Sequence, residues 1–129
     1  PPVAYRNFSI IFLLLSAAMC AYLTGEQARD WEKQVAGYRA LLPLLPQPGA
    51  TVMTLNPPGW WYVARTPSIQ VPSNGPAAAL AAAARYGATY LVLEPARAKA
   101  WEGFDPQAAG PHFQPVAAAG DWLLLRVSP

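Results

Sequence analysis

The chain has 129 residues, enough for one domain of ordinary size. Its net charge of +2, from nine Lys and Arg against seven Asp and Glu, is too small to indicate a nucleic-acid-binding protein. Only 12% of the residues are charged, about half the share of roughly 25% in average globular domains. Such a low charge indicates a membrane segment or a partner surface. The single cysteine, Cys20, excludes an intrachain disulfide and a cysteine-based zinc site.

Residues 1–25 are predicted to form a transmembrane helix, of which residues 7–25 are the uncharged part. No charged residue lies between Arg6 and Glu26, and residues 10–15 at the centre are strongly apolar. About 20 helical residues cross the ~30 Å hydrocarbon core of a bilayer, so this run is long enough. Because the chain begins with Pro1 and not with Met, we expect this helix to be the last span of a longer protein.

The flanks of this helix predict how it crosses the membrane. Tyr5 and Tyr22 lie where an interfacial belt of aromatic residues is expected. Arg6 precedes the apolar run, whereas the charges that follow it nearly cancel. The positive-inside rule therefore places the N-terminal end in the cytoplasm and residues 26–129 outside it.

Three alternatives to a spanning helix are consistent with the same residues. A cleaved signal peptide would use Arg6 as its basic start, residues 8–15 as its apolar part and residues 16–18 near the cleavage point. A lipoprotein signal would lipidate Cys20, but Met19 stands where a small residue is expected. The third alternative is a buried helix of a soluble protein.

Residues 26–49 are predicted to be an amphipathic connector, a helix that ends at the Pro- and Gly-rich residues 46–49. Thr24 is the expected N-cap, with Gln27 as its capping-box partner. Pro43 is expected to disturb the last turn. Apolar residues at steps of three and four form one stripe, which we expect to pack on the domain that follows: Trp31, Val35, Tyr38, Leu41, Leu42 and Leu45.

Residues 50–129 are predicted to form an extracytoplasmic α/β domain. The succession of strand, helix, strand and helix within residues 50–86 is typical of a parallel α/β unit. The predicted fold is a small three-layer, mostly parallel sheet of about five strands with a C-terminal antiparallel hairpin. Asn56 and Asn74 are the expected caps of its first two helices. The predicted strands are residues 50–55, 67–71, 88–93, 112–119 and 121–127, and the predicted helices are residues 59–66, 76–86 and 95–101.

Ligands of open parallel sheets gather at the carboxyl ends of the strands, which gives a set of candidate contacts. The aromatic residues 60–62 follow the first of these ends and suit the stacking of a sugar ring or a membrane surface. In the alternative interpretation, one or two of these rings fill the gap between helix and sheet. The candidate substrate-contact residues are Asn56, Trp60, Trp61, Arg65, Asn74 and Glu94.

The sequence carries no catalytic or metal-binding motif. Glu94 at a strand end has the chemistry of a general base, but an acid at this position is more typical of a helix start. His112 is the only histidine, so neither a multi-histidine metal site nor a choice of triad bases is available, and we expect it to be exposed. The turns at residues 56–59 and 73–76 lack the spacing of glycine-rich phosphate loops. No cofactor is therefore predicted for this chain.

A succession of short motifs gives the chain a resemblance to a known family. From residues 10 to 127 it resembles the C-terminal extracytoplasmic domain of bacterial polytopic glycosyltransferases of the GT-C type, related to the dolichyl-phosphate-mannose protein mannosyltransferases and the lipid A aminoarabinose transferases. The motifs, which follow a membrane helix and a helix ending in Leu-Pro, are Val52-Met53, Asn56-Pro-Pro-Gly59, Ala64-Arg65-Thr-Pro67, Ile69-Gln-Val-Pro72, Asn74-Gly75, Ala83-Ala-Arg-Tyr-Gly87 and Tyr90-Leu-Val-Leu-Glu94.

The resemblance implies a parent enzyme of the bacterial cell membrane that transfers a sugar from a polyprenyl-phosphate donor to a glycan or protein acceptor outside the cytoplasm. In that family the catalytic Asp lies in an early extracytoplasmic loop, so no catalytic residue of this chain corresponds to it. The resemblance also implies an upstream transmembrane domain as partner and a divalent-metal dependence that varies among members. The alternatives are a singly anchored, non-enzymatic glycan- or protein-binding module and a small soluble enzyme using Glu94 and His112.

Overall fold

The computed structural model describes the chain except for residues 1, 96–100, 102–103 and 106–109. The chain divides into two compact units, Pro1–Gln34 and Val35–Pro129. The division falls within the predicted connector and not at its end, because the residues from Val35 onward belong to the core of the α/β domain.

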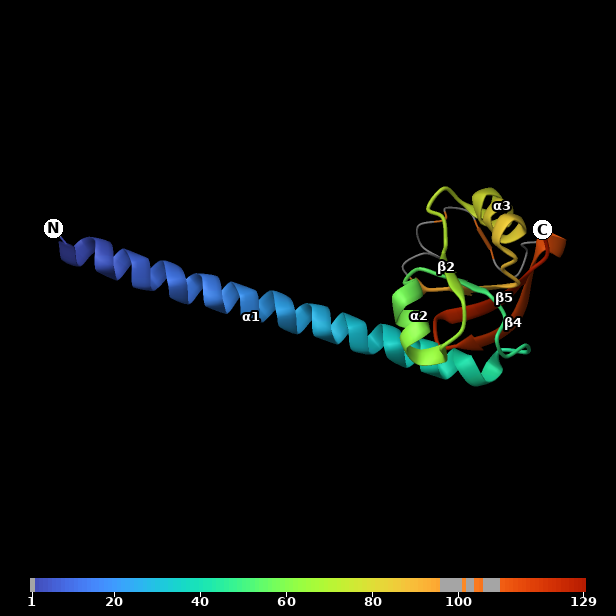
Figure 1. Ribbon diagram of the computed structural model, residues 1–129, viewed down its shortest axis with the longest axis horizontal. Coiled ribbons are helices and arrows are strands. Elements are labelled where there is room, and N and C mark those ends of the chain that lie inside the picture. Colours follow the sequence, from blue (N-terminus) through green and yellow to red (C-terminus); the bar gives the residue numbers. More distant parts are fainter. Residues whose placement is uncertain (1, 96–100, 102–103, 106–109) are drawn as a thin grey trace. The chain divides into compact units, whose positions relative to one another are not determined.

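Helix α1 extends from Pro2 to Leu41 without interruption (Figure 1). The expected start of a second helix at Thr24 is wrong. The Thr24 hydroxyl instead donates to the Cys20 carbonyl at 2.7 Å, so it bonds back to the preceding turn and caps nothing. Pro43 lies in a short 3₁₀ helix, Leu42–Leu44, so it disturbs the last turn as predicted. The α-helix itself ends at Leu41, before the predicted end at residues 46–49.

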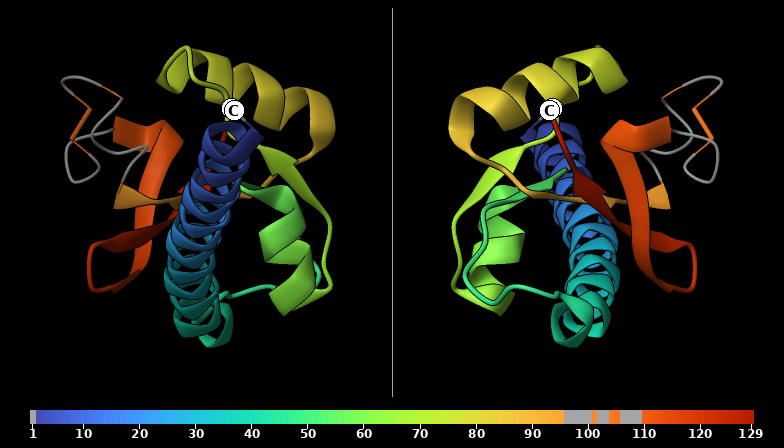
Figure 2. Two further views of the ribbon diagram at one scale, coloured as in Figure 1. Left: turned by 90° about the vertical axis from the view of Figure 1, so that its left-hand side faces the viewer. Right: turned by 90° about the vertical axis from the view of Figure 1, so that its right-hand side faces the viewer.

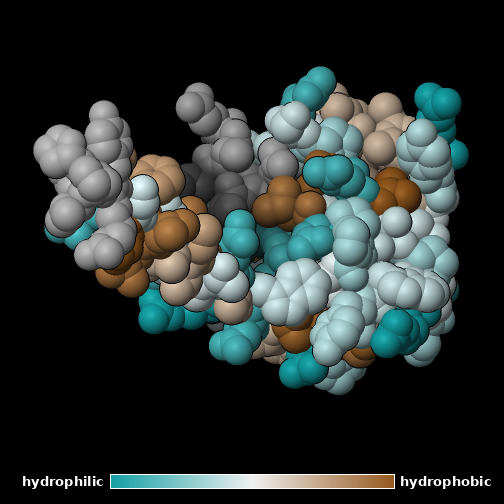
Figure 3. Space-filling view, turned by 60° about the vertical axis from the view of Figure 1, so that its left-hand side comes forward, coloured by the Kyte–Doolittle hydropathy of each residue, from teal (hydrophilic) through white to brown (hydrophobic). Residues whose placement is uncertain are grey.

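The N-terminal part of α1 is long and apolar enough, by length and composition, to cross a membrane. Its large apolar side chains are exposed on all sides, with Phe8 70% and Leu14 66% accessible. Hydrophobic residues gather over this helix in the space-filling view (Figure 3). Transfer of such side chains from water to an apolar surrounding is favourable, which agrees with a helix that is a candidate for crossing a membrane.

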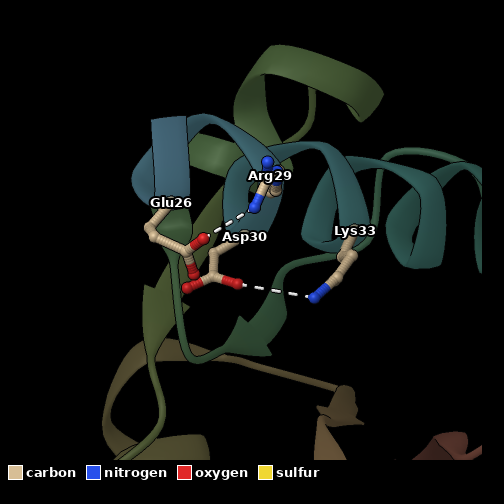
Figure 4. Close-up of polar contacts among 4 residues, drawn as sticks. All are labelled: Glu26, Arg29, Asp30 and Lys33. Atoms are coloured by element: carbon tan, nitrogen blue, oxygen red, sulfur yellow. Dashed lines mark hydrogen bonds and ion pairs between the residues drawn. The ribbon is translucent and has the colours of Figure 1, made fainter. Parts of the chain in front are cut away.

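The charges that follow the apolar segment are paired along the helix (Figure 4). Arg29 Nη1 lies 2.7 Å from Glu26 Oε1, and Lys33 Nζ lies 3.7 Å from Asp30 Oδ1. Both pairs are solvent-exposed and three residues apart, so each stabilises the helix by about 0.5 kcal/mol at most. Because three acidic and two basic residues lie in residues 26–33, this stretch carries little net charge.

The described part of the Val35–Pro129 unit forms a five-stranded sheet in the order β2-β1-β3-β5-β4. Strand β1 pairs in parallel with β2 and β3, whereas β5 is antiparallel to both β3 and β4. Four strands therefore run in one direction and β5 in the other, which confirms the mostly parallel sheet and the C-terminal hairpin. The strands are β1 Val52–Thr54, β2 Ser68–Gln70, β3 Tyr90–Leu93, β4 Phe113–Ala119 and β5 Trp122–Val127.

Helices cover both faces of this sheet, as the predicted three-layer architecture requires (Figure 2). Helix α2, Pro57–Ala64, and the end of α1 lie on one face, and α3, Pro76–Tyr86, lies on the other. All four residues of β3 are buried, with Tyr90 and Val92 in one core and Leu91 and Leu93 in the other. The apolar sequence of β3 follows from this burial on both faces.

A close approach fixes the end of α1 against the start of β5. A Cβ atom at Gly37 would lie only 2.4 Å from the indole ring of Trp122. The ring also packs edge-on against Tyr38, with 5.4 Å between the ring centroids. Gly37 therefore occupies a helix interior because the indole needs the space that a side chain would fill.

The predicted elements agree with the observed ones except at their ends. Helix α3 has the predicted bounds, whereas the strands are shorter than predicted and α2 begins two residues earlier, at Pro57. The predicted helix over residues 95–101 lies mostly outside the described residues.

Candidate functional site

The carboxyl ends of the three parallel strands bring two of the predicted contact residues together. Strands β1 and β3 are neighbours, and Asn56 and Glu94 follow their last residues closely. The backbone N–H of Leu55 donates to Glu94 Oε1 at 3.1 Å, which ties the two strand ends together. Residues 72–74 follow the parallel strand β2 on the other side of β1.

The side chain of Tyr38, from helix α1, lies at the carboxyl ends of β1 and β3. Its hydroxyl donates to Glu94 Oε1 and accepts from the Asn56 backbone N–H at 3.3 Å. Tyr38 is fully buried and Glu94 is only 3% exposed. A buried carboxyl group is costly without donors, and here the hydroxyl and the Leu55 N–H supply them. The Tyr38–Glu94 pair thus closes the position at which open sheets usually bind ligands.

The surroundings of Tyr38 keep its hydroxyl protonated. Burial, followed by the hydrogen bond to Glu94 and its charge, raises the pKa of Tyr38 well above its ordinary value of 10.0. A hydroxyl that holds its proton so firmly donates a hydrogen bond but does not act as a base near neutral pH. The arrangement therefore suits a structural contact between helix and sheet.

The raised pKa of Tyr38 predicts a specific loss of stability in alkali. The folded protein retains the Tyr38 proton above pH 10, where the unfolded chain releases it, so this stabilising contribution is complete below pH 10 and declines as the pH rises further. We expect Tyr38→Phe to remove up to about 1.4 kcal/mol per pH unit from the slope of unfolding free energy above pH 10. Urea unfolding in detergent micelles at stepped pH measures the slope. An identical slope in the variant would contradict the assignment, and Tyr86→Phe, at an exposed tyrosine, is the control.

Asn56 and Trp60 serve local structure in this arrangement. Asn56 is the N-cap of α2, as predicted, because its Oδ1 accepts from the Gly59 N–H at 3.1 Å. Trp60 has no exposed surface and packs edge-on against Tyr38, with ring centroids 5.5 Å apart. Its Nε1 donates to Thr66 Oγ1 at 2.9 Å. The ring of Trp60 therefore fills the gap between helix and sheet and has no surface on which a ligand could stack.

The other aromatic residues of α2 face solvent. Trp61 is 50% and Tyr62 is 52% exposed. Arg65 ends the helix in the left-handed conformation, with φ of 55°, and its guanidinium lies 6.0 Å from the centroid of the Tyr62 ring. Of the predicted contact residues on this segment, Trp61 and Arg65 remain accessible to a ligand.

Asn74 lies in a separate place and does not cap α3. The N-cap is Gly75, with φ of 102°, and no side chain bonds to the first turn of the helix. Asn74 Oδ1 instead accepts from the Ser73 hydroxyl at 3.1 Å. The expected cap at Asn74 is therefore wrong, because glycine adopts the positive φ that this turn requires more readily than asparagine does. Residues 70–74 line an open depression of about 370 Å³.

His112 is exposed, as predicted, and its Nδ1 lies 2.7 Å from the carbonyl oxygen of Ser128. Within the described residues, no three His, Cys, Asp or Glu side chains lie close enough together to hold a metal ion.

The sequence did not identify Tyr38 as a site residue, although it carried two signals. A tyrosine in an apolar stripe brings a hydroxyl into a core, and a buried hydroxyl needs a partner. The neighbouring Gly37 is an isolated glycine in a helix, which indicates a close packing contact. Neither signal reveals that the partner is Glu94, because the two residues are 56 positions apart in the chain.

Comparison with protein-family models, with curated proteins and with solved structures found no match to this chain.

Proposed function

We propose that this chain is the last membrane helix and the extracytoplasmic accessory domain of a bacterial membrane glycosyltransferase. The complete enzyme transfers a sugar from a polyprenyl-phosphate donor to an acceptor outside the cytoplasm. Its catalytic residues, and the divalent metal that some members of such a family use, lie outside this chain. The accessory domain helps to shape the acceptor side of the active site.

The observation that carries the proposal is the continuity of helix α1. One helix contains a segment apolar enough to cross a membrane and, with no loop between, the residues that form part of the core of an α/β domain. A domain that only needed anchoring would work equally well on a flexible linker. Building the helix end into the core supports a domain whose attachment to the membrane helix matters for its work.

The structure explains why several of the motifs that carry the resemblance have the residues they have. Asn56-Pro-Pro-Gly59 forms the cap and first turn of α2, and Gly87 ends α3 in the left-handed conformation. Glu94 accepts a hydrogen bond from the Tyr38 hydroxyl. These residues serve the local structure of the domain, which agrees with an accessory role and with catalytic residues in another part of the proposed enzyme.

The proposal is tested by sugar transfer with the complete protein. Membranes containing it should move a labelled sugar from a polyprenyl-phosphate donor to an extracytoplasmic acceptor, and membranes without it should not. Absence of transfer with every polyprenyl-phosphate sugar tried, together with glycan binding by the chain alone, would favour the singly anchored binding module.

A further inference from the structure

We propose that the depression lined by residues 70–74 is a binding subsite for a neutral sugar unit of the acceptor. This inference rests on the proposed function, because the acceptor is what an accessory domain of a glycosyltransferase would hold. The segment that follows edge strand β2 and leads to α3 can be seen in Figure 1. The depression is lined by residues 70–74, at the carboxyl end of β2 and in this segment.

The hydrogen bonding at the ends of the neighbouring strands β1 and β3 supports a subsite at residues 70–74. The strand ends of β1 and β3 meet at the Tyr38–Glu94 pair, so their polar groups are bonded within the protein. The end of β2 differs, because Gln70, Ser73 and Asn74 are exposed, and the hydrogen bond from the Ser73 hydroxyl to Asn74 Oδ1 lies at the surface. It is therefore the carboxyl end at which polar side chains of the parallel strands can reach a ligand.

The lining of the depression defines the chemistry of its ligand. Pro72 is half-buried and supplies apolar atoms, whereas Val71 is 1% exposed and belongs to the core. The side chains of Gln70, Ser73 and Asn74 supply two amides and a hydroxyl. None of the five lining residues is charged. Amides both donate and accept hydrogen bonds, as sugar hydroxyls require, and apolar atoms suit the C–H faces of a sugar ring. A phosphate or carboxylate would find no cationic side chain among these residues.

The size of the depression agrees with a small ligand. Its volume of about 370 Å³ lies near the lower end of the usual range for small-molecule sites, about 300–1,000 Å³. The depression is open to solvent, so it suits one unit of a longer glycan, whose neighbouring units extend beyond it.

The test is a titration of the full chain in a detergent that has no sugar head group, followed by NMR of the Gln70 and Asn74 side-chain amides. The probes are glucose, mannose, galactose and N-acetylglucosamine, with inorganic phosphate as the anionic comparison. We expect at least one sugar to shift both amide signals. Gln70→Ala and Asn74→Ala should each weaken binding about three- to tenfold, the loss of one hydrogen bond.

Gln114→Ala is the matched control, because Gln114 is an exposed glutamine on β4, the opposite edge strand of the sheet. It should leave the affinity unchanged. The inference is overturned if no sugar shifts the two amides, if the variants bind as the wild type does, or if phosphate alone binds. Sugar transfer by the complete protein together with any of these results would remove the subsite and leave the proposed function standing, whereas sugar binding here without transfer would remove the proposed function.

Discussion

Trp60→Ala is expected to lower the free energy of unfolding by about 3–5 kcal/mol. The Trp60 ring has no exposed surface and contacts Tyr38 edge-on, and its Nε1 bonds to Thr66. Removing the ring leaves a cavity between α2 and the sheet and deprives Tyr38 of an aromatic neighbour. Urea unfolding in detergent micelles, followed by the fluorescence of the remaining tryptophans, measures the loss.

The adjacent tryptophan provides a matched control. Trp61 is on the same helix but 50% exposed, so Trp61→Ala should change the free energy of unfolding by only about 0.5 kcal/mol. Equal effects of the two substitutions would contradict the placement of α2, since they would mean that both rings are buried or both exposed.

Leu41→Ala is expected to cost about 2–5 kcal/mol, which tests whether the end of α1 belongs to the core of the α/β domain. Leu41 is fully buried in the same core as Trp60 and Tyr90. If α1 were only a membrane anchor, truncating a side chain in its last turn would leave the domain unaffected.

Leu44 is the control for this prediction. It lies three residues further along, in the 3₁₀ helix, and is 43% exposed. Leu44→Ala should cost about 1 kcal/mol or less, because most of the area lost already faces solvent. A larger loss for Leu44→Ala than for Leu41→Ala in the same urea titrations would show that the helix packs with a different face.

Regular elements with strong local signals could be predicted from the sequence. The alanine-rich stretch 76–86, bounded by Pro76 and by Gly87 in the left-handed conformation, forms a helix with the predicted ends. The apolar stripe of the predicted connector is buried at Val35, Tyr38, Leu41 and Leu45, whereas Trp31 is 40% exposed. The C-terminal hairpin follows from two β-forming runs joined at Gly120, which has a positive φ.

Local capping signals do not predict the continuity of α1. Thr24 and Gln27 have the spacing of a capping box, but the preceding residues already form a helix, so the Thr24 hydroxyl bonds to the Cys20 carbonyl. A cap forms only where the chain enters a helix from a non-helical conformation. Composition alone does not show whether two neighbouring helical segments are joined.

Parallel strand pairing explains which candidate residues lie at one edge, but not how they pack there. Asn56 and Glu94 lie close together because β1 and β3 are parallel neighbours that end at the same edge. The sequence did not show that Tyr38 fills this edge, because contacts between distant segments depend on the packing of the whole domain. Because the Tyr38 hydroxyl bonds to Glu94 and to the Asn56 N–H, these two candidate ligand contacts serve the structure of the domain. Residues 70–74 then form the strand end that remains open to solvent.

The central structural claim is that the Tyr38–Glu94 pair joins the end of α1 to the carboxyl edge of the sheet. A double-mutant cycle with Tyr38→Phe and Glu94→Met tests it most directly, because Phe removes only the hydroxyl and Met keeps the length of Glu without its oxygens. Each single variant should be destabilised, and the double variant should lose less than the sum of the two, by a coupling free energy of about 1–3 kcal/mol. Losses that simply add, measured by urea unfolding of all four proteins in the same detergent, would contradict the claim.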